Sequence, residues 1–326
     1  MIGRRGEHAG DSIMKKLVCM LPLVLGAVVT NSAVAQDRIV TAASLFDRYD
    51  VNATWAQLPP GQTWGEGGTV GVATDGKGLV VALVRSAPYF RVFTTGGKFV
   101  KAWGAPGQFD HAHSVHFGPD GAVWATDPNI HLIYKFSPEG KLLMTLGKKG
   151  VAGDNLSHDT FNRPAGLAIA PNGDILIADG YGNSRVVQLD KDGKFIRIIG
   201  GKKGNGPGEL QLPHAVSVDS AGRVVVADSA NKRISIFDKD GTFLKSFAGP
   251  SRGGVTVTPD GTIYASDIYA AAVTVFKNDR IVDVIRVGAR PHGMGVDPTT
   301  GDIYVASTDP DAPTITKASP KQSTSK

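Results

Sequence analysis

The chain has 326 residues, with 35 Lys and Arg against 30 Asp and Glu, which gives a formal net charge of +5. This positive balance is mild and no concentrated basic stripe accompanies it, so the composition argues against a nucleic-acid-binding protein. Cys19 is the only cysteine and lies near the N-terminus. Disulfides therefore cannot hold the fold, and a chain of this length must rely on a large hydrophobic core.

The first 35 residues have the pattern of a secretory signal peptide. A basic pair, Lys15–Lys16, precedes the apolar run Leu17–Val29, and Ala33-Val34-Ala35 forms a cleavage site. Met14 is the more natural start of this leader. The apolar run is short for a membrane span, although an uncleaved anchor is the alternative. We therefore expect a secreted or periplasmic protein that is cleaved after Ala35 and has no membrane association afterwards.

Two segments near the middle of the chain repeat one another. Residues 162–200 and 211–249 share the same order of apolar runs and turns, and Asp179 and Asp228, at matching positions, are 49 residues apart. A period of roughly 40 to 50 residues with four short apolar runs is typical of one blade of a β-propeller.

The first copy predicts four strands, at residues 165–170, 175–178, 185–189 and 195–199. Asn172-Gly173 and Asp192-Gly193 lie between strands, and such dipeptides tolerate the positive φ of a tight hairpin. A single sheet of this kind cannot bury both of its faces, so several copies must pack side by side.

The same pattern recurs along the chain and predicts an all-β fold, a six-bladed β-propeller spanning residues 70–308. The ends of the six second strands are 39 to 52 residues apart, at Val84, Asp127, Asp179, Asp228, Asp267 and Ser307. Residues 36–69 are predicted to be a lead-in, of which 51–58 complete the last blade and close the ring. Residues 314–317 are predicted to add one further strand to the last blade. Residues 309–326, rich in Pro, Ser, Thr and Lys, are otherwise predicted to be a polar, partly disordered tail.

Three of the eight histidines, His113, His214 and His292, occur where an inner strand begins. Inner strands line the central channel of a propeller, so the three imidazoles are expected to converge at one end of it. Three histidine nitrogens with one open position are the usual ligands of catalytic zinc. The alternative is that each histidine is only a polar residue at the rim of the channel.

Two further residues break the repeat. Tyr181 lies in the loop after the second strand, where the next blade has Ala230, and a tyrosine above the channel can act as an acid or base. The alternative is a surface tyrosine that packs on its own loop. Arg85 lies where other blades have aspartate, and its guanidinium could hold a substrate carboxylate bidentately. The alternative is a salt bridge within the rim.

The segments GYGNSRVVQLDKDGKFI and LPHAVSVDSAGRVVVADSANKRISIFD resemble the peptidyl-α-hydroxyglycine α-amidating lyases. These are six-bladed propellers of NHL repeats with a central zinc, and the resemblance extends from about residue 70 to residue 307. It implies that zinc is bound by His113, His214 and His292, that Tyr181 is catalytic, and that Arg85 engages the substrate.

The resemblance also implies a calcium ion in the channel, held partly by the main-chain carbonyls of Val72 and Val115. The family's calcium aspartate is replaced here by Gly293, and its methionine two residues before the third histidine by Arg290. An arginine at this place is expected to contact the substrate.

The reaction implied by the resemblance cleaves an N-acyl-α-hydroxyglycine to a primary amide and glyoxylate, so a small-molecule or peptide substrate is expected. Two alternatives are a metal-dependent lactonase on the same scaffold and a non-catalytic periplasmic propeller that binds a protein or peptide. A closed ring has few free sheet edges, so we expect a monomer.

Overall fold

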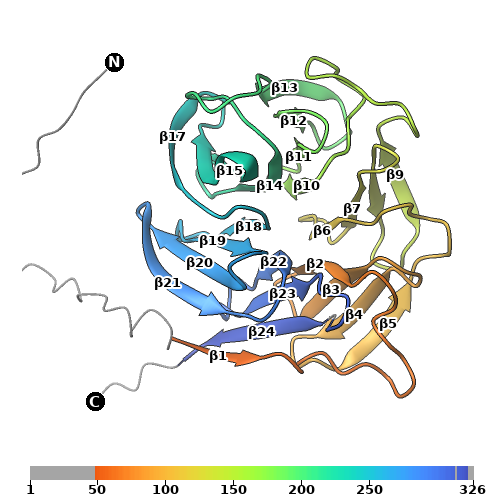
Figure 1. The fold of residues 1–326 in the computed structure, drawn as a ribbon. Helices are drawn as coiled ribbons and strands as arrows, with labels where there is room; N and C mark the ends of the chain where they lie inside the picture. The colour runs from red at the N-terminus through yellow and green to blue at the C-terminus, as the bar shows by residue number, and fades with distance from the viewer. Residues whose placement is uncertain (1–47, 313, 322–326) are drawn as a thin grey trace, which may run out of the picture. The chain divides into compact units, whose positions relative to one another are not determined.

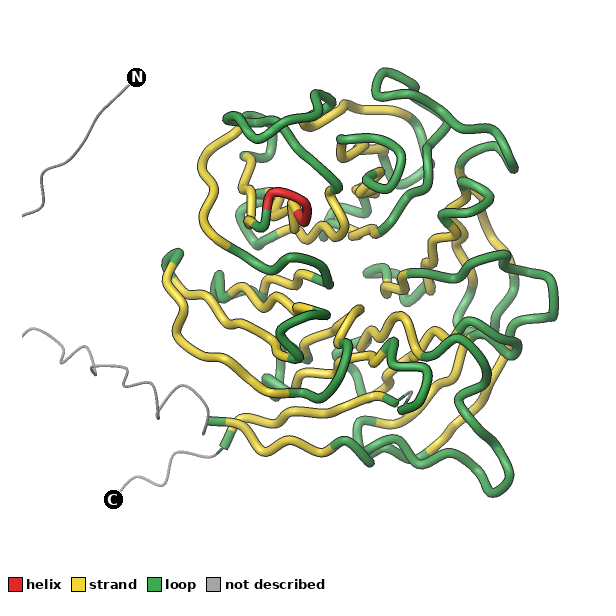
Figure 2. Tube along the Cα trace, in the orientation of Figure 1, coloured by secondary structure: helices red, strands yellow, loops and turns green. Residues whose placement is uncertain are grey.

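The computed structural model describes residues 48–312 and 314–321, and over these residues β-strands joined by loops and turns make up nearly all of the regular secondary structure (Figures 1 and 2). Six antiparallel sheets of four strands are arranged as the blades of a propeller. In this part of the chain the one helical element is a short 3₁₀ helix, η2 (Ser229–Asn231), and no helix has the length and apolar character of a membrane span. The predicted signal peptide lies outside the described residues.

The strands of each blade follow one another outward from the channel, except in the last blade. Blades 1 to 3 consist of β2 (Thr69–Thr74), β3 (Leu79–Val84), β4 (Phe90–Thr94) and β5 (Phe99–Trp103); β6 (Ser114–Phe117), β7 (Val123–Asp127), β8 (Leu132–Phe136) and β9 (Leu142–Leu146); β10 (Gly166–Ile169), β11 (Ile175–Asp179), β12 (Arg185–Leu189) and β13 (Phe195–Gly200). Blades 4 to 6 consist of β14 (Pro213–Val218), β15 (Val224–Asp228), β16 (Arg233–Phe237) and β17 (Phe243–Ala248); β18 (Val255–Val257), β19 (Ile263–Asp267), β20 (Ala272–Lys277) and β21 (Arg280–Arg286); β22 (Pro291–Val296), β23 (Ile303–Ser307), β24 (Ile315–Pro320) and β1 (Tyr49–Asn52).

The structure confirms the predicted all-β, six-bladed fold. In blade 3 each predicted strand is present, and the two predicted turns have Gly173 and Gly193 at φ of +90° and +84°. Without a Cβ, glycine adopts this conformation at little cost, which lets the chain reverse between antiparallel strands.

The core of the propeller lies between the blades. Each inner strand contacts the inner strands of both neighbouring blades, so β2, β6, β10, β14, β18 and β22 form a closed ring (Figure 1). Six clusters of buried apolar side chains fill the six interfaces between adjacent blades. Burying both faces of every sheet in this way holds the inner strands, and whatever side chains begin them, in fixed positions around one axis.

The prediction for the ends of the ring is wrong in its boundaries. The closing strand is β1, which pairs antiparallel with β24 from Tyr49↔Pro320 to Asn52↔Lys317, rather than residues 51–58. The strand expected at 314–317 is present as β24, but it runs on to Pro320 into the predicted polar tail, and its Ile315 and Ala318 are fully buried. The sheets therefore extend from residue 49 to residue 320, beyond the predicted 70–308, because the last blade needs both ends of the chain to reach four strands.

We expect Ile315→Ala to lower the free energy of unfolding by about 2–5 kcal/mol, because it opens a cavity between blades 6 and 1. Ile315 is fully buried and packs in a cluster with Tyr304 and Phe93. Val51→Ala on the facing strand is the control, since that side chain is 46% exposed and its loss is expected to cost less than about 0.5 kcal/mol. Urea unfolding measures both variants, and equal losses would contradict the role given to β24.

Candidate active site

Three histidines converge on the axis of the propeller from alternate blades. His113 immediately precedes β6, His214 lies in β14 and His292 lies in β22. All three are buried, their ring centroids are 4.7–5.1 Å apart, and one nitrogen from each lies within 4.8 Å of the others. The structure therefore brings together the three residues that the repeat pattern singled out.

Each imidazole is tied to a main-chain carbonyl of the next blade. The Nδ1 atoms of the three histidines lie 2.6, 2.8 and 2.7 Å from carbonyl oxygens, in the pairs His113–Ala165, His214–Gly253 and His292–Val70. A carbonyl can only accept, so each Nδ1 carries the proton and each neutral ring presents an unprotonated Nε2. A second hydrogen bond of this kind is what orients metal-ligating histidines in proteins.

Burial keeps these imidazoles neutral. It lowers the pKa of His292 to about 4, and it lowers the pKa values of His113 and His214 well below the usual range. The neighbouring imidazoles lower the pKa of His113 further, because two positive charges this close repel. At neutral pH the three rings are free of protons at Nε2 and form a donor set that fits a metal ion.

We expect the metal-free protein to lose stability in acid. A depressed histidine pKa means that the unfolded chain binds more protons, so the free energy of unfolding is highest above pH ~6.5 and falls as the pH falls towards 4. For His292 the shift from 6.5 to about 4 corresponds to about 3 kcal/mol. Urea unfolding in a chelator at several pH values tests this: His292→Asn should flatten the pH dependence, whereas the exposed His158→Ala should leave it unchanged. Equal slopes for wild type and His292→Asn would contradict it.

Tyr181 extends over two of the histidines. Its hydroxyl lies 2.8 Å from Nε2 of His113 and 3.0 Å from Nε2 of His214, and Arg252 Nη2 donates to it at 3.1 Å. The loop that carries it can approach this closely because Gly180 precedes it: a Cβ there would lie 1.9 Å from the carbonyl oxygen of Pro213. The phenol thus stands between the histidines and a guanidinium, where it can accept or release a proton.

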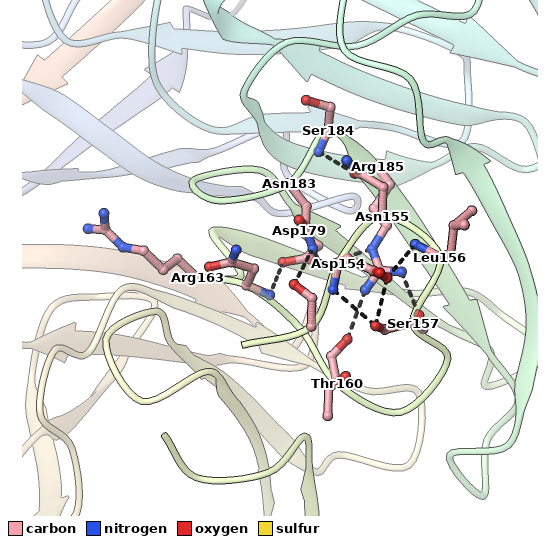
Figure 3. A network of polar contacts seen from close by, with 12 residues as sticks. Asp154, Asn155, Leu156, Ser157, Thr160, Arg163, Asp179, Asn183, Ser184 and Arg185 are labelled. Carbon is pink, nitrogen blue, oxygen red and sulfur yellow. Dashed lines mark hydrogen bonds and ion pairs between the residues drawn. The ribbon is translucent and has the colours of Figure 1, made fainter. Parts of the chain in front are cut away.

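A buried network fixes the base of the Tyr181 loop (Figure 3). Asp179 accepts from Arg185 Nε at 2.9 Å, from Asn183 at 2.8 Å and from the main-chain N–H of Asn162 at 2.8 Å. Both members of the Asp179–Arg185 ion pair are fully buried. The next blade repeats the ion pair with Asp228 and Arg233, as expected for a feature of the repeat, whereas a tyrosine follows the aspartate only in some blades.

Arg85, Arg163 and Arg252 lie near Tyr181, and Arg290 lies near Arg85; we call these four residues the arginine collar. The guanidinium carbons of Arg163 and Arg252 lie 5.5 and 5.4 Å from the centre of the Tyr181 ring. Burial lowers the pKa of Arg85; the nearby Tyr181 acts in the opposite sense, and the charges of Arg252 and Arg290 lower the pKa further. The Nε of Arg85 is buried without a hydrogen-bond partner among the described residues. The collar therefore places positive charge beside the three histidines, whose pKa values Arg85 and Arg252 help to lower.

Sequence reasoning named Arg85 and Arg290 but missed Arg163 and Arg252. Arg163 and Arg252 occupy the same position of the repeat, shortly before the inner strand, and this shared position could have identified them. The main-chain carbonyl at this position accepts a hydrogen bond from the loop after the second strand. This bond recurs in five blades, with the acceptors Gly68, Arg163, Leu212, Arg252 and Arg290.

The residues predicted to hold calcium, Val72 and Val115, line a cavity that continues along the inner strands from the histidines. Calcium prefers six to eight oxygen ligands, usually with carboxylates among them. Among the described residues that line this cavity there is no Asp or Glu. Gly293, where the family pattern has aspartate, adds no side chain at all, so the donor set does not fit calcium.

Comparison with known proteins places these features in context. Residues 161–189 and 210–237 match the NHL repeat. NHL repeat-containing protein 3 of Homo sapiens is 34% identical over 286 residues, which cover 79% of this chain and 81% of the human protein. The probable peptidyl-alpha-hydroxyglycine alpha-amidating lyase pgal-1 of Caenorhabditis elegans is 35% identical over 143 residues, which cover 43% of this chain and 40% of the worm protein.

Among solved structures, a streptogramin B lyase aligns with a TM-score of 0.58 at 14% identity, covering 84% of this chain and 98% of that one. XC5397 of Xanthomonas campestris, described as a gluconolactonase, aligns with a TM-score of 0.61 at 14% identity, covering 78% of this chain and 87% of that one. At this level of identity the likeness shows the propeller fold alone.

Proposed function

Because this chain belongs to the family of NHL repeat-containing protein 3, and peptidyl-α-hydroxyglycine α-amidating lyases are among its relatives, we propose that it is a metal-dependent lyase that cleaves N-acyl-α-hydroxyglycines to a primary amide and glyoxylate. The observation that carries the proposal is the contact of the Tyr181 hydroxyl with Nε2 of both His113 and His214, at 2.8 and 3.0 Å. It joins a proton-transfer group to a three-nitrogen donor set.

His113, His214 and His292 would hold the metal. A tetrahedral set with three histidine nitrogens and an open position suits zinc, and bound zinc supplies a Lewis acid that lowers the pKa of the substrate's hydroxyl group. The carbonyl partners of the three Nδ1 atoms leave each Nε2 available to a metal, and one nitrogen from each ring lies within 4.8 Å of the others, so the rings are oriented before any ion binds.

Tyr181 would move the proton. As the O–H proton of the α-hydroxyl passes to the phenol oxygen, the C–O bond becomes a carbonyl and the C–N bond breaks. The nitrogen takes the electron pair of that bond and one proton, so the net transfer is from oxygen to nitrogen and the atoms balance. Tyr181 would accept this proton as its phenolate, and Arg252 Nη2, 3.1 Å from the tyrosine oxygen, would stabilise the negative charge that the oxygen carries before the transfer.

Arg85 and Arg290 would hold the carboxylate that becomes part of glyoxylate. Arg85 is the more buried of the two arginines. Burial lowers its pKa, and the nearby positive charge of Arg290 lowers that pKa further. Two guanidiniums around one carboxylate would fix the position of the reacting carbon relative to Tyr181. Holding the reacting groups in this way contributes to catalysis by proximity and orientation.

The test is an assay of the purified protein, loaded with zinc, on N-benzoyl-α-hydroxyglycine. Benzamide and glyoxylate should form in equal amounts, and the activity should disappear in a chelator and return with zinc. Sugar lactones in the same assay serve as the control for a lactonase. A zinc-loaded protein that produces no benzamide above the uncatalysed rate would exclude the lyase and favour a binding propeller.

A further inference from the structure

The arginine collar carries more positive charge than the proposed reaction uses. The α-hydroxyglycine part of the substrate brings one carboxylate, which Arg85 and Arg290 suffice to hold. Arg252 is occupied by its hydrogen bond to the Tyr181 hydroxyl. Arg163 is left over, on the opposite side of the ring from Arg290, since it precedes blade 3 and Arg290 precedes blade 6.

Arg163 has no acidic partner, unlike the arginines of the repeat. Arg185, Arg223 and Arg233 each pair with an aspartate at 2.6–2.9 Å. Within the described part of the chain, neither Arg163 nor any other collar arginine forms an ion pair. Figure 3 shows Arg163 extending away from the Asp179 network, and its guanidinium lies over the ring of Tyr181. Arg163 is exposed, so its guanidinium is open to an anion that enters from solution.

The backbone at Arg163 is also unusual. Its φ is +59°, and the next residue is Pro164; Arg290, before Pro291, has φ of +50°. A side chain with φ in this region is rarely favoured, and a following proline restricts the residue further. The carbonyl of Arg163 accepts from the N–H of Tyr181 at 3.3 Å, so the repeat holds this arginine directly beside the proton-transfer group.

We propose that Arg163 binds a second carboxylate, carried by the acyl portion of the substrate, so that the preferred substrate is a dianion lying across the channel mouth from Arg85 and Arg290 to Arg163. This inference rests on the proposed function for the identity of the reacting end. The acyl group would be that of a dicarboxylic acid, or of a peptide whose residue before the hydroxyglycine is acidic.

The activity test compares two substrates of the same shape, N-succinyl-α-hydroxyglycine and its terminal amide, N-succinamoyl-α-hydroxyglycine. A charged hydrogen-bonded pair predicts a kcat/KM about 10- to 100-fold higher for the dianion. This preference should shrink as NaCl is raised from about 0.02 M to about 0.5 M. In Arg163→Gln the ratio should fall towards one, while the exposed Arg280→Gln, at the start of β21, should keep it. Arg163→Gln is made at an exposed side chain, and a melting temperature checks that it folds.

A binding test separates this inference from the lyase itself. Calorimetry with N-succinylglycine and N-succinamoylglycine, which lack the reacting hydroxyl, should show the same preference and the same dependence on Arg163. If this preference is present without any turnover, the second-carboxylate site stands and the lyase does not. If both substrates turn over equally well, or if Arg163→Gln slows them by the same factor, Arg163 only positions Tyr181 and the inference is overturned.

Discussion

Tyr181→Phe is expected to lower kcat for N-benzoyl-α-hydroxyglycine by about 10²- to 10⁴-fold, the usual contribution of a general acid–base group. The substitution removes one oxygen that lies within 3.0 Å of two histidine nitrogens and 3.1 Å from Arg252. Because the three histidines keep their carbonyl partners, zinc content should not change. Steady-state kinetics and elemental analysis of the same preparation measure the two quantities together.

The control is Tyr49→Phe, which removes a phenol hydroxyl from β1 at the outside of blade 6. It should have the kcat of the wild type. A Tyr181→Phe variant with at least half of the wild-type kcat would show that the proton moves by another route. Loss of zinc together with kcat would instead give Tyr181 a role in holding the metal site.

His214→Ala should reduce bound zinc from about one equivalent per chain to nearly none, because two histidines rarely hold zinc without a third protein ligand. Lyase activity should disappear with the metal. The exposed His158→Ala, whose ring stacks on Phe195 away from the channel, is the matched control and should keep its zinc.

The loss of metal has to be separated from loss of the fold. His214 is 3% exposed and its Nδ1 is tied to Gly253, so the variant should unfold at a lower temperature than wild type and still show one cooperative transition. A folded His214→Ala protein that keeps one zinc per chain and full activity would contradict the three-histidine site.

The blades and the three histidines could be predicted from sequence because their signals are local and repeated. A hairpin such as the one at Gly173 is determined by neighbouring residues. Histidines at the same position of different repeats, such as His214 and His292, must lie at the same height along the propeller axis. Topology then brings residues that are far apart in the chain to one axis.

The arginines were harder to predict, because a guanidinium on a long side chain reaches beyond its own blade. Arg252 belongs to blade 5, yet it bonds to Tyr181 of blade 3. The repeat fixes where its backbone lies, and contacts across the channel decide where its charge lies. Blade 5 has a second tyrosine, Tyr269, at the phase of Tyr181. Burial lowers the pKa of Arg252, but Tyr181 and Tyr269 act in the opposite sense and the net effect is a raised pKa.

The closing strand was harder to predict for a different reason. The register Tyr49↔Pro320 joins residues 271 positions apart (320 − 49), and no sequence pattern near residue 49 specifies a partner at that distance. A strand was expected at 314–317, but the burial of Ile315 and Ala318 depends on the packing of β24 between β23 and β1, which the polar composition of residues 309–326 does not reveal.

The pairing of β1 with β24 also sets the timing of folding. Residues 315–320 are made after all the other strands, so every earlier blade can form its hairpins while Tyr49–Asn52 still lacks a partner. Until then the nascent chain presents unsatisfied strand edges at both ends of an open arc, which are sites for chaperones, proteases and mispairing with other chains. A chain that ended before Ile315 would lack β24 and would leave that arc permanently open.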